Sequence, residues 1–168
     1  MSDKSRGNSE TILVVDDSEL FRDFIVAALK RANFNVISAH SGPHAIALAA
    51  KTKGKIDLLL TDWDMPDMSG IALGQTLKLL RPDIHVMQMS GGAHGAMMVM
   101  NYGWAFLQKP FVAKRLVEMI NEVLHGPDRS QLGGESFDAR LDTNPNSPRA
   151  KDPDNHPAES NEPKDRGR

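Results

Sequence analysis

The stretch that decides the fold is Ile56-Asp-Leu-Leu-Leu-Thr-Asp-Trp-Asp-Met-Pro-Asp-Met-Ser-Gly70. Its first part, Ile56–Thr61, is a short apolar run of the kind that forms a buried strand. A turn rich in Asp, Pro and Gly follows, and leucines at helical spacing over residues 73–80 predict a helix that Pro82 ends. The order strand, acidic turn, helix is the repeating unit of an α/β domain.

The same alternation continues on both sides of this stretch. Short apolar runs predict four further strands, at Thr11–Val15, Asn35–Ala39, Ile84–Met89 and Ala105–Gln108. Helical patterns separate them, the first with an apolar stripe formed by Leu20, Phe21, Phe24, Ile25, Ala28 and Leu29. Because the strands are nearly continuous apolar runs that alternate with five helices, we predict a parallel sheet covered by helices on both faces.

Composition divides the chain of 168 residues into unequal parts. Residues 126–168 hold six hydrophobic residues and six of the ten prolines. A segment with so little apolar surface does not offset the entropy of ordering its backbone. We therefore expect a disordered N-terminus at residues 1–9, one domain at 10–125 and a disordered, proline-rich tail at 126–168 without an output domain.

Charge and composition also exclude several classes of protein. The formal net charge of -2 argues against a nucleic-acid binder held by bulk charge. The absence of cysteine excludes disulfides and cysteine-based zinc sites. No apolar run is long enough to span a membrane, and the polar start lacks the features of a signal peptide. The expected location is the cytoplasm. The six histidines show no paired metal-binding spacing, so we expect them at the surface.

Five chemically complementary side chains stand directly after predicted strands: Asp16, Asp17, Asp62, Ser90 and Lys109. In parallel α/β sheets the site lies at the carboxyl ends of the strands. Three carboxylates at one edge repel each other unless a cation joins them, and Mg²⁺ prefers such oxygen ligands. A carboxylate can also attack a phosphoryl group, with a lysine neutralising its charge. A lone aspartate after a strand is usually a cap or turn residue, so the set carries the prediction.

Four motifs, in order, resemble the receiver domain of bacterial response regulators: Val14-Val-Asp-Asp-Ser18, Leu60-Thr-Asp-Trp-Asp-Met-Pro-Asp-Met-Ser-Gly70, Met89-Ser-Gly91 and Lys109-Pro-Phe111. The resemblance covers roughly residues 10–125. It implies a doubly wound (βα)5 fold of the flavodoxin-like type. It further implies two-component signal transduction, in which a histidine kinase or histidine phosphotransfer protein passes a phosphoryl group to Asp62.

The resemblance also assigns a Mg²⁺ site. Asp17 and Asp62 are expected to bind the ion directly, and Asp16 through a water molecule. The backbone carbonyl of Asp64 is expected to complete the protein ligands. The aspartyl phosphate on Asp62 would then form with Mg²⁺ as the cofactor.

Three further residues are expected to bind and report the phosphoryl group. The resemblance implies that Ser90 and Lys109 bind its oxygens. Phe106, three residues before Lys109, stands where the family places an aromatic that turns inward when the serine moves toward the phosphate. A plain core aromatic on a buried strand is the alternative for Phe106.

Two features depart from what the resemblance predicts. Asp64 places an extra carboxylate two residues after the phosphoacceptor, and we expect it to tune phosphoryl lifetime and donor preference; a solvated turn residue is the alternative. The segment Gly91–Trp104 leaves about six residues for the fourth helix after connections of ordinary length. Its Met and aromatic side chains either cover this short helix or form a partner surface.

Three functions are open from the sequence. The first is a single-domain response regulator that catalyses only its own phosphorylation and dephosphorylation and signals through an unidentified protein, without nucleic acid or membrane as partners. The second is a haloacid-dehalogenase-like phosphatase that uses Asp62 and Asp64, although Pro66 fits that motif poorly. The third is a docking module that works without phosphorylation, which gives no reason for all five strand-end residues.

Overall fold

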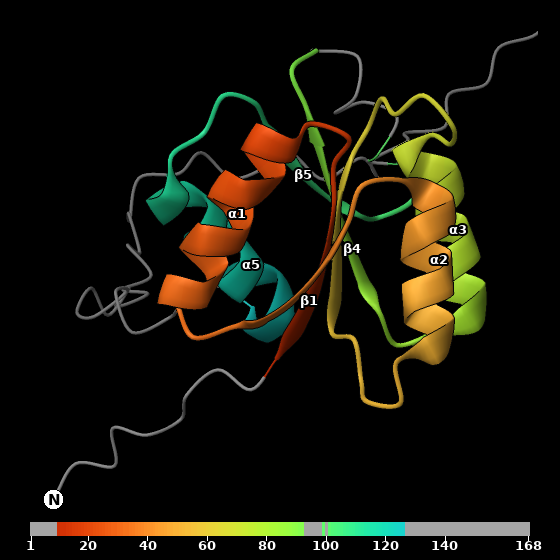
Figure 1. The fold of residues 1–168 in the computed structure, drawn as a ribbon. Coiled ribbons are helices and arrows are strands. Elements are labelled where there is room, and N and C mark those ends of the chain that lie inside the picture. Colours follow the sequence, from red (N-terminus) through yellow and green to blue (C-terminus); the bar gives the residue numbers. More distant parts are fainter. Residues whose placement is uncertain (1–9, 93–98, 100, 127–168) are drawn as a thin grey trace, which may run out of the picture. The chain divides into compact units, whose positions relative to one another are not determined.

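A parallel sheet divides the domain into two helical layers (Figure 1). The computed structural model describes residues 10–92, 99 and 101–126. The strands are β1 (Thr11–Val15), β2 (Asn35–Ala39), β3 (Leu58–Asp62), β4 (His85–Ser90) and β5 (Ala105–Gln108). The helices are α1 (Glu19–Arg31), α2 (Gly42–Lys51), α3 (Gly70–Leu80) and α5 (Ala113–His125). The predicted disordered segments, 1–9 and the tail beyond residue 126, lie outside the described residues.

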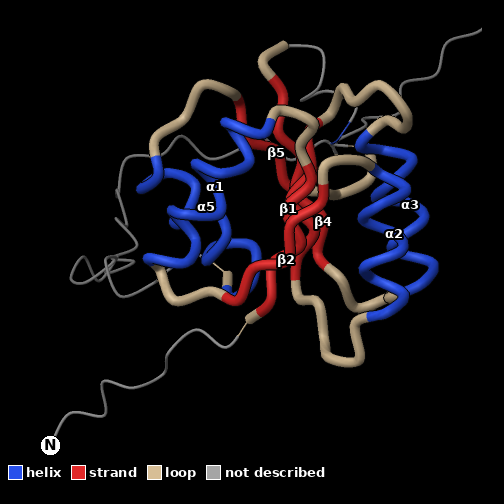
Figure 2. The backbone as a smooth tube through the Cα atoms, in the orientation of Figure 1, coloured by secondary structure: helices blue, strands red, loops and turns tan. Residues whose placement is uncertain are grey.

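The order of the strands in the sheet is β2-β1-β3-β4-β5, and each neighbouring pair is parallel. Figure 2 shows α1 and α5 on one side of the sheet and α2 and α3 on the other. This confirms the predicted doubly wound α/β fold. The chain steps outward from β1 to β2 and then back across to β3. The order reverses at this point, and sites in such folds lie at the carboxyl ends of the strands there.

Each layer of helices has its own core. Ile12, Val14, Leu58 and Leu60 face the layer of α1 and α5, and Leu13, Val15 and Leu59 face the layer of α2 and α3. All seven are fully buried because successive side chains of a strand point to opposite faces. Each such side chain contributes about 1.5–3 kcal/mol through burial. Burial on both faces explains why the strands are apolar without alternation.

Three helices begin with a serine cap at the same end of the sheet. The hydroxyls of Ser18, Ser41 and Ser69 accept hydrogen bonds from the backbone N–H groups three residues later, at 3.4, 3.3 and 3.2 Å. A cap of this kind contributes about 1 kcal/mol, because it satisfies a backbone donor that has no partner within the helix. The caps fix α1, α2 and α3 relative to the loops that follow β1, β2 and β3.

The apolar stripe predicted for α1 is wider than its buried face. Ile25, Ala28 and Leu29 are buried, but Leu20 is 85% exposed and Phe24 is 40% exposed. Helical periodicity predicts an apolar stripe at least about 100° wide. How much of this stripe is buried depends on which neighbouring elements pack against it. Leu20 and Phe24 therefore present apolar surface to solvent.

β3 and β4 begin slightly later than predicted, at Leu58 and His85. Asp57, just before β3, bonds to the backbone of β1: its carboxylate accepts a hydrogen bond from the N–H of Thr11 at 2.8 Å. The Asp57 N–H donates in turn to the Thr11 carbonyl, also at 2.8 Å. β4 runs one residue past its predicted end, to Ser90.

The predicted fourth helix falls in residues 91–104, of which 93–98 and 100 lie outside the described residues. Val99 is helical and fully buried. Trp104 packs on α3, where a Cβ on Gly74 would meet its ring at 2.8 Å. The ring of Tyr102 stacks on Trp104 with centroids 4.7 Å apart. Trp104 therefore covers the core beside α3, whereas the two predicted alternatives concern the fourth helix, most of which lies outside the described residues.

Among the helices of the described residues, none is long and apolar enough to cross a bilayer.

Candidate functional site

Three carboxylates meet where β1 and β3 end. Asp16 and Asp17 follow β1, and Asp62 is the last residue of β3, the neighbouring strand. One carboxylate oxygen from each lies within 4.8 Å of the others. Asp16 is buried, the Asp62 side chain is 13% exposed, and Asp17 is exposed. The structure thus assembles the acidic cluster that the sequence predicts, open to solvent on the side of Asp17.

Lys109 reaches this cluster from the far edge of the sheet. Its Nζ lies 2.9 Å from Asp16 Oδ2 and 2.9 Å from Asp62 Oδ1. The Lys109 N–H donates to the Ser90 carbonyl at 2.9 Å, which continues the pairing of β4 and β5 beyond the end of β5. The side chain is 22% exposed, so both ion pairs are partly shielded from water.

The charges of the cluster do not cancel. Burial raises the pKa of Asp62, the ion pair with Lys109 opposes this, and repulsion from Asp16 adds to it, so that the pKa lies above its ordinary value. Burial lowers the pKa of Lys109, but its bonds to Asp16 and Asp62 outweigh this and raise it. With all groups ionised, three carboxylates against one ammonium leave two negative charges.

This set of donors fits a hard divalent cation. Carboxylate oxygens are the ligands that Mg²⁺ takes, usually one or two from the protein together with waters and a phosphate. The oxygens of Asp16, Asp17 and Asp62 converge, and the uncompensated charge of the cluster matches that of the ion. Asp17 and Asp62 would hold the ion, with Asp16 behind them.

Asp16 itself is held by its neighbours. Its Oδ1 accepts from the Ser18 N–H at 2.9 Å, and its carbonyl accepts from Arg22 Nη1 at 2.7 Å. Its N–H donates to the carbonyl of Ala39, at the end of β2, at 3.3 Å. These bonds tie the loop after β1 to α1 and β2. The Asp16 carboxylate is therefore presented in one orientation toward Lys109.

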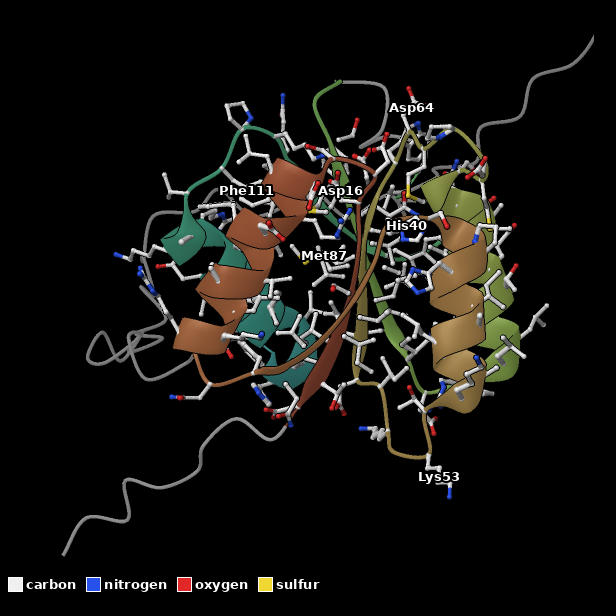
Figure 3. The ribbon with its side chains drawn as sticks, viewed as in Figure 1. Asp16, His40, Lys53, Asp64, Met87 and Phe111 are labelled. Carbon is white, nitrogen blue, oxygen red and sulfur yellow. The ribbon has the colours of Figure 1, made fainter. Side chains whose placement is uncertain are left out.

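The backbone after Asp62 is anchored on both sides. The Trp63 N–H donates to the Met89 carbonyl at 2.8 Å, and the Trp63 carbonyl accepts from the Gly70 N–H at 2.9 Å. Gly70 has no room for a side chain, because a Cβ would lie 2.3 Å from the Asp62 carbonyl oxygen. Asp64 follows Trp63 in the chain, and its side chain is exposed (Figure 3). Within the described residues the Asp64 carboxylate has no hydrogen bond or ion pair.

Ser90 and Phe106 lie on the neighbouring strands β4 and β5. Ser90 is buried at the end of β4, where its Oγ accepts from the Gly92 N–H at 3.1 Å rather than contacting the acidic cluster. Phe106 on β5 is half-buried and lines a surface pocket of about 660 Å³ together with Phe111 and Met119 of α5. Phe106 is therefore not a core aromatic in this structure, and it borders the open side of β5.

Two contacts and one buried polar side chain are not predicted by the sequence. The ring of Phe21 lies under Lys109, with Nζ 4.2 Å from its centroid. His40 and His44, which were expected only to lie at or near the surface, approach to 3.0 Å between their Nδ1 atoms. The side-chain amide of Gln88 is fully buried and has no hydrogen-bond partner among the residues that the structure describes. A phenylalanine four residues after Asp17 was the available signal for the first contact.

The family model of the response regulator receiver domain matches residues 12–121, more than half of the chain. The chain belongs to the response regulator receiver domain family. The match confirms the resemblance and favours it over the phosphatase alternative.

Relatives of this chain include whole regulators and parts of longer proteins. It is 33% identical over 116 residues to the response regulator receiver protein CpdR of Brucella abortus, covering 67% of this chain and 95% of that protein. It is 32% identical over 123 residues to the sensor kinase CckA of the same organism, covering 71% of this chain and 13% of that protein. The chain spans 56% of the regulatory protein PhoB of Pseudomonas aeruginosa, at 33% identity.

Solved structures agree with this placement. A response regulator receiver domain protein from Clostridium thermocellum is 27% identical, with a TM-score of 0.64, covering 73% of this chain and 98% of that one. A CheY-like receiver domain protein from Methanospirillum hungatei is 26% identical, with a TM-score of 0.62. The five-stranded receiver fold is common to all three.

Proposed function

We propose that Asp62 accepts a phosphoryl group from a histidine kinase or histidine phosphotransfer protein in a Mg²⁺-dependent reaction, and that the phosphorylated domain signals through a partner protein. The observation that supports this is the shared ammonium of Lys109, 2.9 Å from both Asp16 and Asp62. A buried nucleophilic carboxylate with a fixed cation beside it suits transfer of an anionic group.

In this proposal an oxygen of Asp62 attacks phosphorus in line with the departing group. A P–O bond to Asp62 forms as the P–N bond to the donor's histidine breaks, and the electron pair of that bond stays on the imidazole nitrogen. Lys109 pairs with the phosphoryl oxygens, and the Ser90 hydroxyl donates to one of them. A bound Mg²⁺ supplies further positive charge to those oxygens. Hydrolysis then returns Asp62 to its carboxylate, with water attacking phosphorus.

The phosphoryl group would change the surface of the domain through Ser90 and then through Phe106. Among the described residues, Ser90 Oγ accepts a hydrogen bond from the Gly92 N–H alone, and the hydroxyl can turn from this bond to donate to a phosphoryl oxygen. Movement of Ser90 vacates space beside β5, which admits the ring of Phe106 from its surface pocket. The phosphoryl group would thereby bias an equilibrium between two arrangements of this face. We further propose that the domain acts as a regulator and catalyses only its own phosphorylation and dephosphorylation.

The phosphodonor would dock over α1. Leu20, the second residue of α1, is 85% exposed and lies close in sequence to Asp16 and Asp17. An exposed apolar side chain beside a reaction site suits the packing of a helical partner. One relative, CckA, is itself a sensor kinase, which supports a kinase as the partner class.

The test uses acetyl phosphate as a small donor, with and without Mg²⁺, and intact-protein mass spectrometry. Wild type is expected to gain one phosphoryl group only with Mg²⁺, and Asp62→Asn none. Asp57→Asn is the matched control, because Asp57 is an equally enclosed carboxylate at the opposite end of β3. Phosphorylation of Asp62→Asn at the wild-type rate would overturn the proposal, as would continuous turnover of acetyl phosphate without a labelled intermediate.

A further inference from the structure

The ammonium of Lys109 has a third neighbour besides its two carboxylates. Nζ lies 4.2 Å from the centroid of the Phe21 ring, within the range of a cation–π interaction. Phe21 belongs to the first turn of α1, and its N–H donates to the Ser18 hydroxyl at 3.4 Å. The acidic loop and the aromatic platform under the lysine are thus joined by a single capped turn.

The Phe21 ring is itself held in place. Phe111, two residues after Lys109, meets it edge to face, with centroids 5.4 Å apart and planes at 68°. Phe24 lies 6.0 Å from Phe21 and 6.4 Å from Phe111. The segment from Lys109 to Phe111 therefore contacts the Phe21 ring twice, once through the ammonium and once through an aromatic edge. This leaves the ring little freedom to turn away.

The three neighbours of the ammonium differ in what phosphorylation does to them. Cation binding and phosphoryl transfer change the charge available on Asp16 and Asp62. The Phe21 face is uncharged, so its attraction for the ammonium persists through both events. Because Lys109 is only 22% exposed, water screens this attraction weakly.

We propose that Phe21 is a positioning residue that keeps the Lys109 ammonium directed at the phosphoryl group while the carboxylates exchange their partners. This inference rests on the proposed function of Asp62. Without the aromatic face, the Lys109 ammonium can turn toward solvent. A smaller fraction of molecules then has the ammonium beside Asp62 when a phosphodonor binds. The ring contributes through Lys109 and does not touch the reacting atoms.

The experiment compares Phe21→Leu, Phe21→Tyr and Phe24→Leu. Leucine keeps the apolar bulk but removes the aromatic face, and tyrosine restores that face. Phe24→Leu is the matched control, since Phe24 belongs to the same aromatic cluster without contacting the lysine. The rate of phosphorylation by acetyl phosphate at saturating Mg²⁺ is expected to fall about five- to tenfold in Phe21→Leu. Phe21→Tyr and Phe24→Leu are expected to stay within about twofold of wild type.

A second readout needs neither phosphorylation nor Mg²⁺. In NMR spectra of the unmodified protein, the ring current of Phe21 should shift the Lys109 Hε signals upfield, with Lys109→Arg used for assignment. The shift should survive in Phe21→Tyr and Phe24→Leu and disappear in Phe21→Leu. If Phe21→Leu does not fold, the shift in wild type and the rate of Phe21→Tyr still test the proposal.

Two kinetic results and one NMR result would overturn the inference. One is a wild-type rate in Phe21→Leu, and the other is an equal loss in Phe24→Leu, which would mean that general packing is responsible. Absence of the upfield shift in wild type would show that the contact does not exist in solution. Failure of the proposed function looks different: wild type would then not be phosphorylated at all, while the NMR shift would be unchanged.

Discussion

Two aspartates at opposite ends of one strand have similar exposure and opposite electrostatics. Asp57 precedes β3 and Asp62 ends it, and their side chains are 12% and 13% exposed. Each has a lysine close by, Lys55 at 2.7 Å and Lys109 at 2.9 Å. Yet the pKa of Asp57 is lowered and that of Asp62 is raised.

Their neighbours explain the difference. Burial raises the pKa of both carboxyl groups, but the bonds from Lys55 and the Thr11 N–H outweigh it at Asp57. At Asp62 burial is again the largest cause, Lys109 is shared with Asp16, and Asp16 adds repulsion. An aspartate that stabilises the fold has a full set of partners. A reactive one is left short of them, and a ligand can supply what is missing.

Exchanging each lysine for a neutral residue should separate the two pairs most clearly. Lys109→Gln is expected to slow phosphorylation of Asp62 by acetyl phosphate about 100-fold or more, because it removes a fixed charge from the transferring group. Lys55→Gln is expected to leave the rate unchanged. Rates from intact-protein mass spectrometry with Mg²⁺ check this. Equal rates in Lys109→Gln and wild type would remove Lys109 from the mechanism.

The structural aspartate should show its effect in stability. Asp57→Asn is expected to lower the free energy of unfolding by about 2 kcal/mol at pH 7, since a charged acceptor for the Thr11 N–H is lost. Lys55→Gln should lower the free energy of unfolding much less than Asp57→Asn does, because water screens a side chain that is 70% exposed. Urea denaturation of the three proteins measures both values. A stable Asp57→Asn would show that the Thr11 bond contributes little.

The same variant predicts a pH dependence. Because the pKa of Asp57 is lower in the folded than in the unfolded chain, its ionised form favours folding. The stability it adds is present above its unfolded pKa of about 4 and is lost as pH falls through the lower folded pKa. The difference in stability between wild type and Asp57→Asn should therefore shrink between about pH 5 and pH 2. A constant difference would contradict the assignment.

Mg²⁺ should stabilise the folded domain through Asp62 and not through Asp57. An ion that binds only the folded state adds about 2.7 kcal/mol to the free energy of unfolding when its concentration is 100 times its Kd, and thermal unfolding detects such a shift. Wild type and Asp57→Asn should both gain stability, whereas Asp62→Asn should gain much less because one ligand is weakened. Equal gains in all three proteins would place the ion elsewhere. Chelation with EDTA should reverse the gain.

The smallest expected effect concerns Asp64, the exposed carboxylate two residues after Asp62, the proposed phosphoacceptor. Asp64→Asn is expected to speed phosphorylation by anionic acetyl phosphate about two- to threefold, because it removes repulsion on the path of the donor. The dephosphorylation rate should change as well. The gain should fade at high salt, which screens exposed charges. Rates equal to wild type in both directions would leave Asp64 a solvated turn residue.

The sequence predicted where the acidic cluster and Lys109 would meet, because their meeting depends on topology. The carboxyl ends of neighbouring parallel strands must meet at one edge, so Asp16 and Asp62 come together once β1 and β3 pair. Lys109 follows β5 and reaches both carboxylates, whereas Ser90 ends β4 at the same edge without contacting them. Their identities then indicate the chemistry. Continuous apolar runs likewise marked the strands to within two residues.

The features that the sequence did not predict depend on how individual side chains pack within the fold. Periodicity placed Phe21 on a core stripe but did not show that its face would meet Lys109. The same stripe included Leu20, which the position of α5 leaves uncovered. Asp57 was taken as part of a strand, whereas its carboxylate bonds the backbone of β1. Such details follow from three-dimensional packing and carry no periodic signal.

The central claim is that Asp62 is the reactive carboxylate of this domain. The most direct measurement phosphorylates wild type with acetyl phosphate and Mg²⁺, reduces the acyl phosphate with borohydride, and locates the resulting homoserine by peptide mass spectrometry. Homoserine is expected at position 62, and unmodified aspartate is expected at positions 16, 17, 57 and 64. Homoserine at any of those other positions, with Asp62 intact, would contradict it.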